Sequence, residues 1–511
     1  MVLLSIISAM SDNQSAWPRQ IFSTEQVRSI DRHAIDDLGI EGFELMRRAG
    51  SAALGFIKQQ WPESKSLLIY CGAGNNGGDG YVLAALAVAD GLAVKVIAVV
   101  DPSTLTDDAA KALTLAREAS IAISEFRADA APPGAAITVD ALLGSGITRD
   151  VDGQLALAVE QINSSSRPVL ALDLPTGLDG DTGAIRGTVI RADATITFVG
   201  LKSGLYLGSG PACRGELAFS DLGLAPSVYR GARPVLRRLD ASDTNQLLRP
   251  RSQISHKGLN GKILIVGGFE GMAGAARLAA DAALRAGAGL VYAAVAPSSV
   301  GTVMADRPEI MCRGVTGPDE LRELTAAVDV IVVGPGLGRD AWGQSIADAL
   351  LAVDKPLVVD ADALNYLSEH RQQRSQWVLT PHPAEAARLL GRSTADVQAA
   401  RHEAAMALAT NYRALAVLKG ACSLVAEWVD HADVAVSVCD YGNPGMATGG
   451  TGDILAGLIG ALIAQFGLSR QTVELGVLVH ALAGDDAAAD GERGLIASDL
   501  LPHIRHRVNP A

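Results

Sequence analysis

The sequence predicts two α/β domains, each built around a largely parallel β-sheet. At 511 residues the chain is too long for one ordinary domain. Short apolar segments typical of buried strands alternate with longer segments in which apolar residues recur at helical spacing. The alternation pauses over residues 228–243, which contain four arginines, and then starts again. We therefore expect a tail (1–19), a first domain (20–237) and a second domain (238–511).

Strands and helices are expected in the same alternating order in both halves. A capping pattern that starts at Ser23 predicts a first helix, and helical spacing continues over residues 42–58. In the first domain we expect a glycine-rich loop at 71–80, a helix at 81–89, and strands at 66–70, 93–100, 136–139, 168–172 and 194–199. In the second we expect a loop at 267–274, a helix at 275–286, and strands at 262–266, 290–295, 330–333, 357–359 and 416–418. Open sheets of this kind bind ligands beyond the carboxyl ends of their strands.

Composition narrows the possible partners and the compartment. The net charge of −13 argues against nucleic acids and acidic membrane surfaces as partners. Five cysteines are scattered without a Cys-x-x-Cys pair, which predicts a reduced, cytoplasmic chain rather than a disulfide framework or a zinc site. The apolar start (1–7) lacks a positively charged segment and is too short to span a membrane, and Met10 is an alternative start. No later segment is apolar over a spanning length.

The stretch from Asn443 to Asp453 (Asn-Pro-Gly-Met-Ala-Thr-Gly-Gly-Thr-Gly-Asp) is the most informative motif in the second half. Its glycines let the backbone approach an anion closely, and the apolar run that follows predicts a helix whose free N–H groups attract negative charge. A carboxylate in an anion site is typical of a general base that deprotonates a hydroxyl during phosphoryl transfer. The alternative is that Asp453 merely caps the helix.

Four other segments at strand ends favour phosphoryl transfer. Two are glycine-rich (267–276 and 332–338) and suit a ligand held by backbone N–H groups. A proline-braced turn carries His382 and Glu385, and a loop beginning at Lys419 offers N–H groups to a nucleotide phosphate. Each has a simpler explanation alone, as a turn residue, a surface charge or the first acid of a helix. Together they make the cap-only interpretation of Asp453 the weaker one.

The first half contains the spacing G-x-G-x-x-G, beginning at Gly72, and Asp101 follows the next strand. An NAD-dependent dehydrogenase is therefore one possibility, although this spacing alone is a weak signal. Asn75, Asn76 and Asp79 argue against it, because a simple pyrophosphate loop is small or apolar at such positions. Turn formation explains one Asn-Gly pair but not the whole cluster. The loop predicts a site that holds polar atoms with side chains.

Two further strand ends carry polar groups. Asp140 opens a glycine-rich loop that ends in an arginine and suits a phosphate, and Asp173 precedes Thr176 by three residues. Asn76, Asp140 and Thr176 supply only hard oxygens, with one carboxylate among them, which suits a monovalent cation better than a transition metal. Asp173 and Lys202 remain as acid/base candidates. For either residue alone, a surface charge is the more common explanation.

Residues 20–230 resemble the NAD(P)H-hydrate epimerases in three motifs that occur in the same order. These are Asn75-Asn-Gly-Gly-Asp79, Leu142-Leu-Gly-Ser-Gly-Ile147 and Asp173-Leu-Pro-Thr-Gly-Leu178. The resemblance implies a Rossmann-like three-layer α/β fold that interconverts the R and S hydrates NADHX and NADPHX, with Asp173 transferring the proton. It assigns K⁺ to Asn76, Asp140 and Thr176, the last of which is often Ser in the family. It assigns substrate contacts to Asn75, Asn76, Gly77, Gly78, Asp79, Gly144, Ser145, Gly146, Ile147, Thr148, Arg149, Asp150 and Asp173.

Residues 240–508 resemble the ribokinase-like superfamily, and within it the ADP/ATP-dependent NAD(P)H-hydrate dehydratases. The similarity rests on His256-Lys-Gly, the small-residue helix at 274–280, Pro381-His-Pro and the 443–453 motif. It implies that Asp453 is the base and that Glu385 helps to organise a hydrated Mg²⁺. It assigns hydrate contacts to Ala273, Gly336, His382 and Asp453, and nucleotide contacts to Lys419, Gly420, Ala421, Cys422, Ser423 and Gly452. The family usually has Gly where this chain has Ala384.

Together the two resemblances imply a fused enzyme that repairs nicotinamide cofactors. One domain would epimerise the hydrate, and the other would dehydrate the S form with ADP, giving AMP, phosphate and NADH or NADPH. The residues themselves do not distinguish ADP from ATP. Two alternatives stay open: a ribokinase-like small-molecule kinase with an N-terminal nucleotide-binding module, and a non-catalytic protein whose first half binds a protein partner. Apolar helices such as 458–466 suggest a homo-oligomer.

Overall fold

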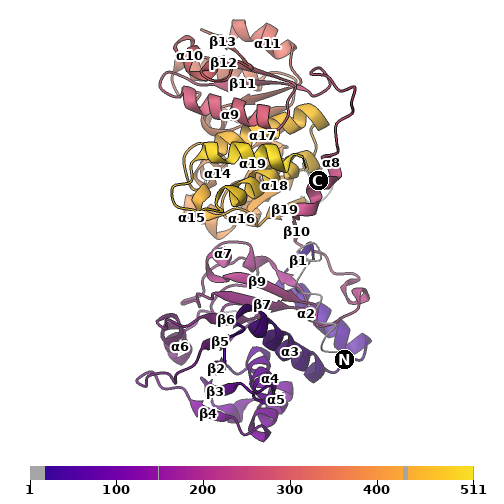
Figure 1. Cartoon of the computed structure of the whole chain (residues 1–511), viewed down its shortest axis with the longest axis vertical. Coiled ribbons are helices and arrows are strands. Elements are labelled where there is room, and N and C mark those ends of the chain that lie inside the picture. The colour runs from indigo at the N-terminus through magenta and orange to yellow at the C-terminus, as the bar shows by residue number, and fades with distance from the viewer. Residues whose placement is uncertain (1–17, 148, 430–434, 510–511) are drawn as a thin grey trace. The chain divides into compact units, whose positions relative to one another are not determined.

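The computed structural model describes residues 18–147, 149–429 and 435–509, and the chain divides into two compact units after Leu236. Each unit has its own hydrophobic core. Figure 1 shows that both combine a β-sheet with packed helices, so the expected fold class of two α/β domains is confirmed. Within the described residues, no helix is both long and apolar enough to cross a membrane.

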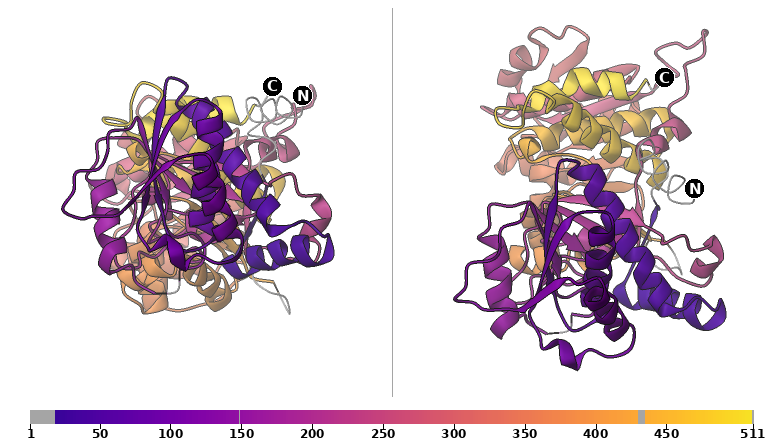
Figure 2. Two further views of the ribbon diagram at one scale, coloured as in Figure 1. Left: turned by 90° about the horizontal axis from the view of Figure 1, so that it is seen from below. Right: turned by 60° about the horizontal axis from the view of Figure 1, so that its bottom comes forward.

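The sheet of the first unit has the order β4-β3-β2-β5-β6-β7-β9, and all its strands are parallel. Helices α3, α4 and α5 cover one face and α6 covers the other, which gives three layers (Figures 1 and 2). The strands are β2 (Ser66–Cys71), β3 (Ala93–Ala98), β4 (Ala122–Glu125), β5 (Ile137–Ala141), β6 (Val169–Leu172), β7 (Ala194–Phe198) and β9 (Glu216–Ser220). The helices are α3 (Gly42–Gln60), α4 (Asn75–Ala89), α5 (Asp107–Glu118), α6 (Gly153–Asn163) and the short α7 (Gly210–Cys213).

Two strands of this unit lie outside its seven-stranded sheet. Strand β1 (Gln20–Phe22) runs parallel to β8 (Leu201–Lys202), with Phe22 opposite Lys202. Helix α2 (Thr24–Arg32) follows at once, and the Ser23 hydroxyl accepts the backbone N–H of Gln26 in the expected capping box. The start of α2 is therefore fixed next to the strand that carries Lys202.

The second unit has the strand order β13-β12-β11-β14-β15-β16-β17-β18-β19-β10, in which only β18 is antiparallel to its neighbours. Its strands are β10 (Leu236–Arg238), β11 (Lys262–Gly267), β12 (Leu290–Val295), β13 (Ile310–Gly314), β14 (Val330–Val333), β15 (Leu357–Val359), β16 (Trp377–Leu379), β17 (Leu415–Leu418), β18 (Ser423–Glu427) and β19 (Ala435–Cys439). Its helices are α8 (Thr244–Leu247), α9 (Ala273–Arg285), α10 (Val300–Met304), α11 (Arg322–Ala326), α12 (Ala341–Leu351), α13 (Ala361–Glu369), α14 (Pro383–Leu390), α15 (Thr394–Ala399), α16 (Arg401–Tyr412), α17 (Thr451–Phe466), α18 (Arg470–Ala487) and α19 (Leu500–Arg507).

Three local expectations differ from the structure. Residues 75–80, expected in a loop, form the first turn of α4, because glycine permits a close approach there: a Cβ on Gly77 would lie 2.2 Å from the carbonyl oxygen of Gly72. The arginine-rich segment 228–243 contains strand β10. The apolar residues 458–463 of α17 are buried against the core of the unit, so they offer no surface to a second subunit, and the homo-oligomer stays a prediction.

Candidate active sites

A buried acid and a buried hydroxyl are bonded to each other at the carboxyl ends of the strands in the first unit, and a buried amide lies at the start of α4, the helix that packs against β5. Asp140, in β5, is fully buried and accepts the Thr176 hydroxyl at 2.7 Å and the N–H groups of Thr176 (2.8 Å) and Leu142 (3.1 Å). Burial raises the pKa of Asp140 to about 6, although these hydrogen bonds oppose the rise. The amide of Asn76 is also buried, and neither its oxygen nor its nitrogen has a hydrogen-bond partner.

These three side chains fit the K⁺ ion that the sequence resemblance implies. A buried amide oxygen without a donor is costly, and a bound cation would satisfy it. Asn76, Asp140 and Thr176 together supply one carboxylate and neutral oxygens, the donor set of a hard monovalent cation. The orphaned amide of Asn76 is the feature that most clearly calls for a ligand here.

Asp173 lies directly after β6 and forms an ion pair with Lys202, whose ammonium group is 2.5 Å away. Both side chains are largely buried, and the second carboxylate oxygen of Asp173 accepts the N–H of Ser145 at 3.1 Å. Lys202 also donates to the hydroxyl of Thr197 (3.1 Å) and the carbonyl of Phe198 (2.7 Å). The φ angle of Asp173 is 64°, in the left-handed region that disfavours side chains, and such strain is typical of functional residues.

The motifs predicted to contact the hydrate surround Asp173. A Cβ on Gly144 would lie 3.0 Å from a carboxylate oxygen of Asp173 and 3.4 Å from the Asn76 side chain, so the 144–150 loop borders both. Burial raises the pKa of Asp79, and the neighbouring Asp173 raises it further. In this loop and the Asn75–Asp79 motif, Gly77 and Gly78 are buried, Ile147 is half-buried, and Asn75, Gly146, Arg149 and Asp150 are exposed, whereas Thr148 lies outside the described residues.

The acid expected to mark a dehydrogenase has a different task. Asp101 is exposed and accepts the N–H of Ser103 at 2.8 Å, so it caps the short turn 102–104. The glycine-rich segment leads into α4, as the loop of a simple dinucleotide-binding site leads into a helix. Unlike such a loop, it carries the buried Asn76, whose amide has no hydrogen-bond partner.

In the second unit, Asp453 is the third residue of α17 and does not cap it. Gly450 takes the cap position with φ 97°, and no side chain accepts a hydrogen bond from the first turn. Burial raises the pKa of Asp453 to about 7; Asp360 raises it further, while Lys419 lowers it. The carboxyl is thus poised between its charged and neutral forms near neutral pH, as a general base requires.

Lys419 is the central cation of this site. Its ammonium group lies 2.8 Å from Asp360 and 3.9 Å from Glu385, and a Cβ on Gly452 would lie 3.2 Å from it. Burial alone would lower the pKa of Lys419, but the two acids raise it above its ordinary value. Asp360 is buried at the end of β15 and also accepts the Thr380 hydroxyl at 2.8 Å.

His382 and Glu385 form a capping box at the start of α14. Nδ1 of His382 accepts the N–H groups of Ala384 (3.1 Å) and Glu385 (3.4 Å), and Glu385 accepts the N–H of His382 at 2.8 Å. Nε2 of the ring lies 3.4 Å from Oε1 of Glu385, and the side chain is about half exposed. His382 therefore caps α14 and also keeps an exposed ring face that a ligand can contact.

The carboxylates of this site fit Mg²⁺ only together with a nucleotide. Among the described residues, no group of three His, Cys, Asp or Glu side chains is arranged to hold a metal. Mg²⁺ commonly keeps several waters and uses one or two carboxylates plus substrate phosphates. Glu385 and Asp360, which flank Lys419, are the acids placed to fill that role.

The remaining predicted contacts lie on two backbone segments. Gly336 (φ 58°) packs against the start of α9, where its Cβ would lie 2.6 Å from the carbonyl oxygen of Met272, next to the buried Ala273. The other segment, 419–423, joins β17 to β18; Gly420 has φ 140°, and Ala421 is exposed whereas Cys422 is buried. Ser423 donates to the carbonyl of Gly420 at 3.1 Å.

Sequence reasoning missed three side chains at this site. Asp360 follows a strand directly, so the rule that identified Asp140 and Asp173 also applies to it. His480 on α18 lies 2.9 Å from the carbonyl of Thr451 through Nε2, and burial lowers its pKa to about 4, so it is a neutral donor to the start of α17. Arg401 supports the 419–423 segment from α16. Neither His480 nor Arg401 lies near a motif.

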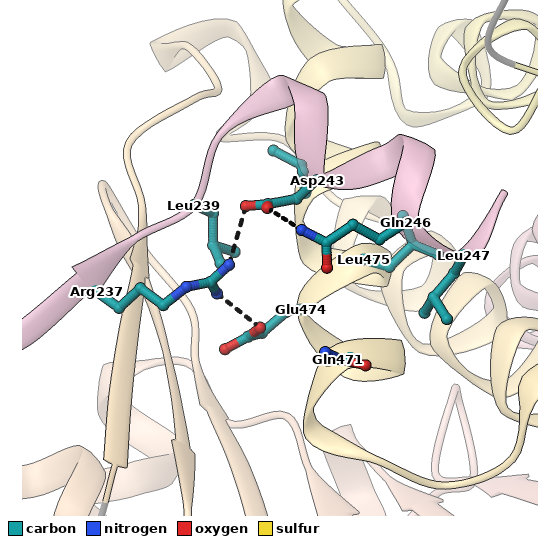
Figure 3. A pocket seen from close by; sticks show the side chains of 9 residues that line it. Arg237, Leu239, Asp243, Gln246, Leu247, Gln471, Glu474 and Leu475 are labelled. Carbon is teal, nitrogen blue, oxygen red and sulfur yellow. Dashed lines mark hydrogen bonds and ion pairs between the residues drawn. The ribbon is translucent and has the colours of Figure 1, made fainter. Parts of the chain in front are cut away.

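A small cavity of the second unit is lined by residues outside these strand ends (Figure 3). Arg237 projects into it and pairs with Asp243 (3.2 Å) and Glu474 (3.0 Å), and Gln246 donates to Asp243 at 2.8 Å. Because Arg237 already pairs with both acids that line it, this cavity lacks the features of an active site.

Comparison with known proteins extends the resemblance to the whole chain. A family model described as NAD(P)H-hydrate dehydratase matches residues 263–506, and one described as YjeF-related protein N-terminus matches residues 42–204. A bifunctional NAD(P)H-hydrate repair enzyme from Coxiella burnetii is 43% identical over 491 residues, which cover 96% of this chain and 99% of that protein. The corresponding enzyme of Escherichia coli is 41% identical over 505 residues, with 98% and 96% covered.

Among solved structures, the ADP/ATP-dependent NAD(P)H-hydrate dehydratase of Bacillus subtilis, co-crystallised with ATP and Mg²⁺, is 27% identical and covers 53% of this chain and 97% of its own, with a TM-score of 0.46. The likeness to the two repair enzymes, by contrast, runs through both units and nearly the full length of each protein. The chain belongs to the family of bifunctional NAD(P)H-hydrate repair enzymes.

Proposed function

We propose that the chain restores hydrated nicotinamide cofactors in two steps. The first unit epimerises the R and S forms of NADHX and NADPHX, and the second dehydrates the S form at the expense of ADP. One observation carries this proposal in a chain of this family. Each unit has a carboxyl close to a buried lysine at its strand-end site. The pairs are Asp173 with Lys202 and Asp453 with Lys419.

In the first unit, Asp173 is the proton-transfer group. The hydrate carries its hydroxyl on C6, next to the ring nitrogen, so inversion at C6 requires a proton to be removed and returned. Lys202 stabilises the ionised carboxylate, and the N–H of Ser145 fixes its orientation. When bound, K⁺ supplies a positive charge that holds the loops of Asn76, Asp140 and Thr176 together. The segments 75–79 and 144–150 then hold the substrate.

In the second unit, Asp453 removes the proton of the C6 hydroxyl. The hydroxyl oxygen attacks the terminal phosphoryl group of ADP, AMP leaves, and phosphate then departs from C6 as a proton is lost from C5. Lys419 and the N–H groups of 420–423 and Gly452 hold the nucleotide phosphates. Gly336, Ala273 and His382 border the hydrate. Mg²⁺, when bound, neutralises charge on the transferring phosphoryl group.

The choice of ADP over ATP rests on the resemblance to fused chains of this kind. The 419–423 segment and Lys419 suit a terminal phosphoryl group of either nucleotide, since both present the same oxygens. A kinase that leaves its phosphate on the product is the alternative, and the orphaned amide of Asn76 and the carboxyl-rich first site argue against it.

The test is to incubate the protein with a mixture of R- and S-NADHX, K⁺, Mg²⁺ and either ADP or ATP, and to follow the absorbance of NADH. We expect complete recovery of NADH with ADP, with one AMP and one phosphate formed per NADH. A phosphorylated product without NADH would favour the kinase. No recovery with either nucleotide would contradict the proposed dehydration.

A further inference from the structure

Helix α2 lies against the strand ends that form the first site. Phe22, the residue two positions before the helix, stands opposite Lys202 in the β1–β8 pair. The first turn is held by Thr24, whose N–H and hydroxyl donate to the carboxylate of Asp181 at 2.6 and 3.1 Å. Two independent attachments therefore fix the direction in which α2 leaves the site.

One face of α2 is directed toward Asp173. Val27 packs against the turn before Lys202, since a Cβ on Gly200 would lie 3.0 Å from its methyl group. Arg28 donates to the carbonyl of Ser145 at 2.5 Å, and the N–H of the same Ser145 donates to the carboxylate of Asp173. Asp31 is four residues after Val27 and three after Arg28, so it shares their face, and helical side chains lean toward the N-terminus. This places its carboxyl over the gap between Lys202 and the Ser145 loop.

The carboxyl of Asp31 has no bonded partner there. Within the described residues, it makes neither a hydrogen bond nor an ion pair, and it is half-buried. The three N–H groups of Lys202 already serve Asp173, Thr197 and Phe198. A carboxyl that is drawn into a site but left free is available to a substrate.

Its charged neighbours set its protonation. Burial raises the pKa of Asp31 to about 6, with Lys202 lowering it and Asp173 raising it. Asp79 of α4 also faces this group. Burial raises the pKa of the half-buried Tyr229, and the charges of Asp221 and Asp31 raise it further. One lysine thus faces three carboxyls, so a proton shared among them is expected near neutral pH.

The chemistry of the hydrate calls for two groups. Its C6 carries both a hydroxyl and the ring nitrogen, and such a centre inverts by ring opening and closure. A base removes the hydroxyl proton, the C6–N bond breaks to give an aldehyde, and the nitrogen accepts a proton from an acid. After rotation about the C5–C6 bond, the nitrogen attacks the other face of the aldehyde, returns its proton to the acid, and the base returns a proton to the oxygen. No oxidant or further reactant is needed.

We propose that Asp31 is the second proton-transfer group of the epimerase, serving as the acid that protonates the ring nitrogen while Asp173 serves as the base. The proposal rests on the epimerase function proposed above. It assigns a catalytic task to a helix that lies before the region matched by the epimerase-side family model, residues 42–204.

The test compares Asp31→Asn, Asp31→Glu and Asp36→Asn in the full-length chain. Asp36 lies on the next turn and is exposed, so it controls for removal of a carboxyl from this segment. We expect Asp31→Asn to lower kcat for conversion of R-NADHX about 100-fold, the usual scale of one acid or base, with KM nearly unchanged. The fall of kcat/KM above about pH 6 in the wild type should disappear in Asp31→Asn and persist in Asp31→Glu and Asp36→Asn.

The second unit supplies an internal control, because dehydration of pure S-NADHX should proceed at the wild-type rate in all three variants. An Asp31→Asn variant with wild-type epimerisation and pH profile would overturn the proposal. So would one in which KM rises while the pH profile is unchanged, since that pattern indicates a structural role. If the wild type itself does not convert R-NADHX, the epimerase function fails, and the two failures are thereby distinguished.

Discussion

Asp453 has a pKa that burial raises to about 7, and this value predicts the pH dependence of dehydration. Only the ionised carboxylate accepts a proton, so kcat/KM for S-NADHX should fall about tenfold for each pH unit below about 7 and level off above it. Asp453→Asn should reduce the rate by a factor on the order of 10²–10⁴. The measurement is NADH formation from S-NADHX across this range. The control is epimerisation of R-NADHX by the Asp453→Asn variant, which should match the wild type at each pH. Retention of the acid limb in Asp453→Asn would assign the titration to another group.

Asn76 is buried with an amide that no described group satisfies, which predicts a K⁺-dependent epimerase. Asn76→Leu keeps the approximate volume but removes the oxygen. We expect the variant to lose the stimulation that KCl gives over choline chloride, while its thermal stability without K⁺ stays the same or rises, because an unsatisfied amide has been removed. An Asn76→Leu variant that K⁺ still stimulates would show that the cation binds elsewhere.

Single residues at strand ends were the most predictable part of both sites. Asp140, Asp173 and Thr176 were predicted to share one edge because polar groups that follow buried strands face the same edge of the sheet. In the structure Thr176 donates to Asp140, and Lys202 donates to Asp173. Asp31 and Arg401 could not be found in this way, since helical residues reach a site only through the packing direction of their helix. That direction depends on contacts such as Arg28 with Ser145, which are 117 residues apart.

At the scale of elements, the two α/β domains follow from alternating patterns, but the strand order and the ends of the elements depend on distant partners. The segment 228–243 resembles a solvated linker because it is rich in arginine. It contains β10 because the backbone of Arg237 and Arg238 pairs with the distant strand β19. The two side chains bind Glu474 and Asp440, more than 200 residues away. The early start of α4 has a similar cause, since the glycine at position 77 is explained only by the neighbouring carbonyl of Gly72.

The loop between β17 and β18 depends on helix α16 through Arg401. Arg401 is 4% exposed as a whole residue. Its guanidinium lies 3.3–3.4 Å from the carbonyls of Leu418, Lys419 and Cys422 and forms no ion pair within the described residues. We expect Arg401→Met to raise the KM for ADP about tenfold, equivalent to about 1.4 kcal/mol, with kcat little changed. The reason is that the carbonyls of the 419–423 segment and of Leu418 lose their common donor, so the N–H groups of the segment are no longer held in place for the nucleotide phosphates.

The matched control for this loop is Arg392→Met. Arg392 is an exposed arginine in the short turn between α14 and α15, so its loss removes the same charge away from the loop. Initial rates of NADH formation at varied ADP give both constants. If Arg401→Met keeps the wild-type KM, the loop is held by its own backbone rather than by α16.

At the scale of the whole molecule, the two units have separate cores and separate sets of reactive groups, so each activity should survive loss of the other. Asp173→Asn should convert only the S part of an R/S mixture of NADHX, and Asp453→Asn should convert none. An equimolar mixture of the two variants should restore NADH from both epimers, because the S hydrate released by one molecule can be dehydrated by another. The double variant and a sample without protein measure spontaneous epimerisation. If the mixture stops at the yield of Asp173→Asn alone, the hydrate does not pass freely between molecules, and repair requires both sites in one chain.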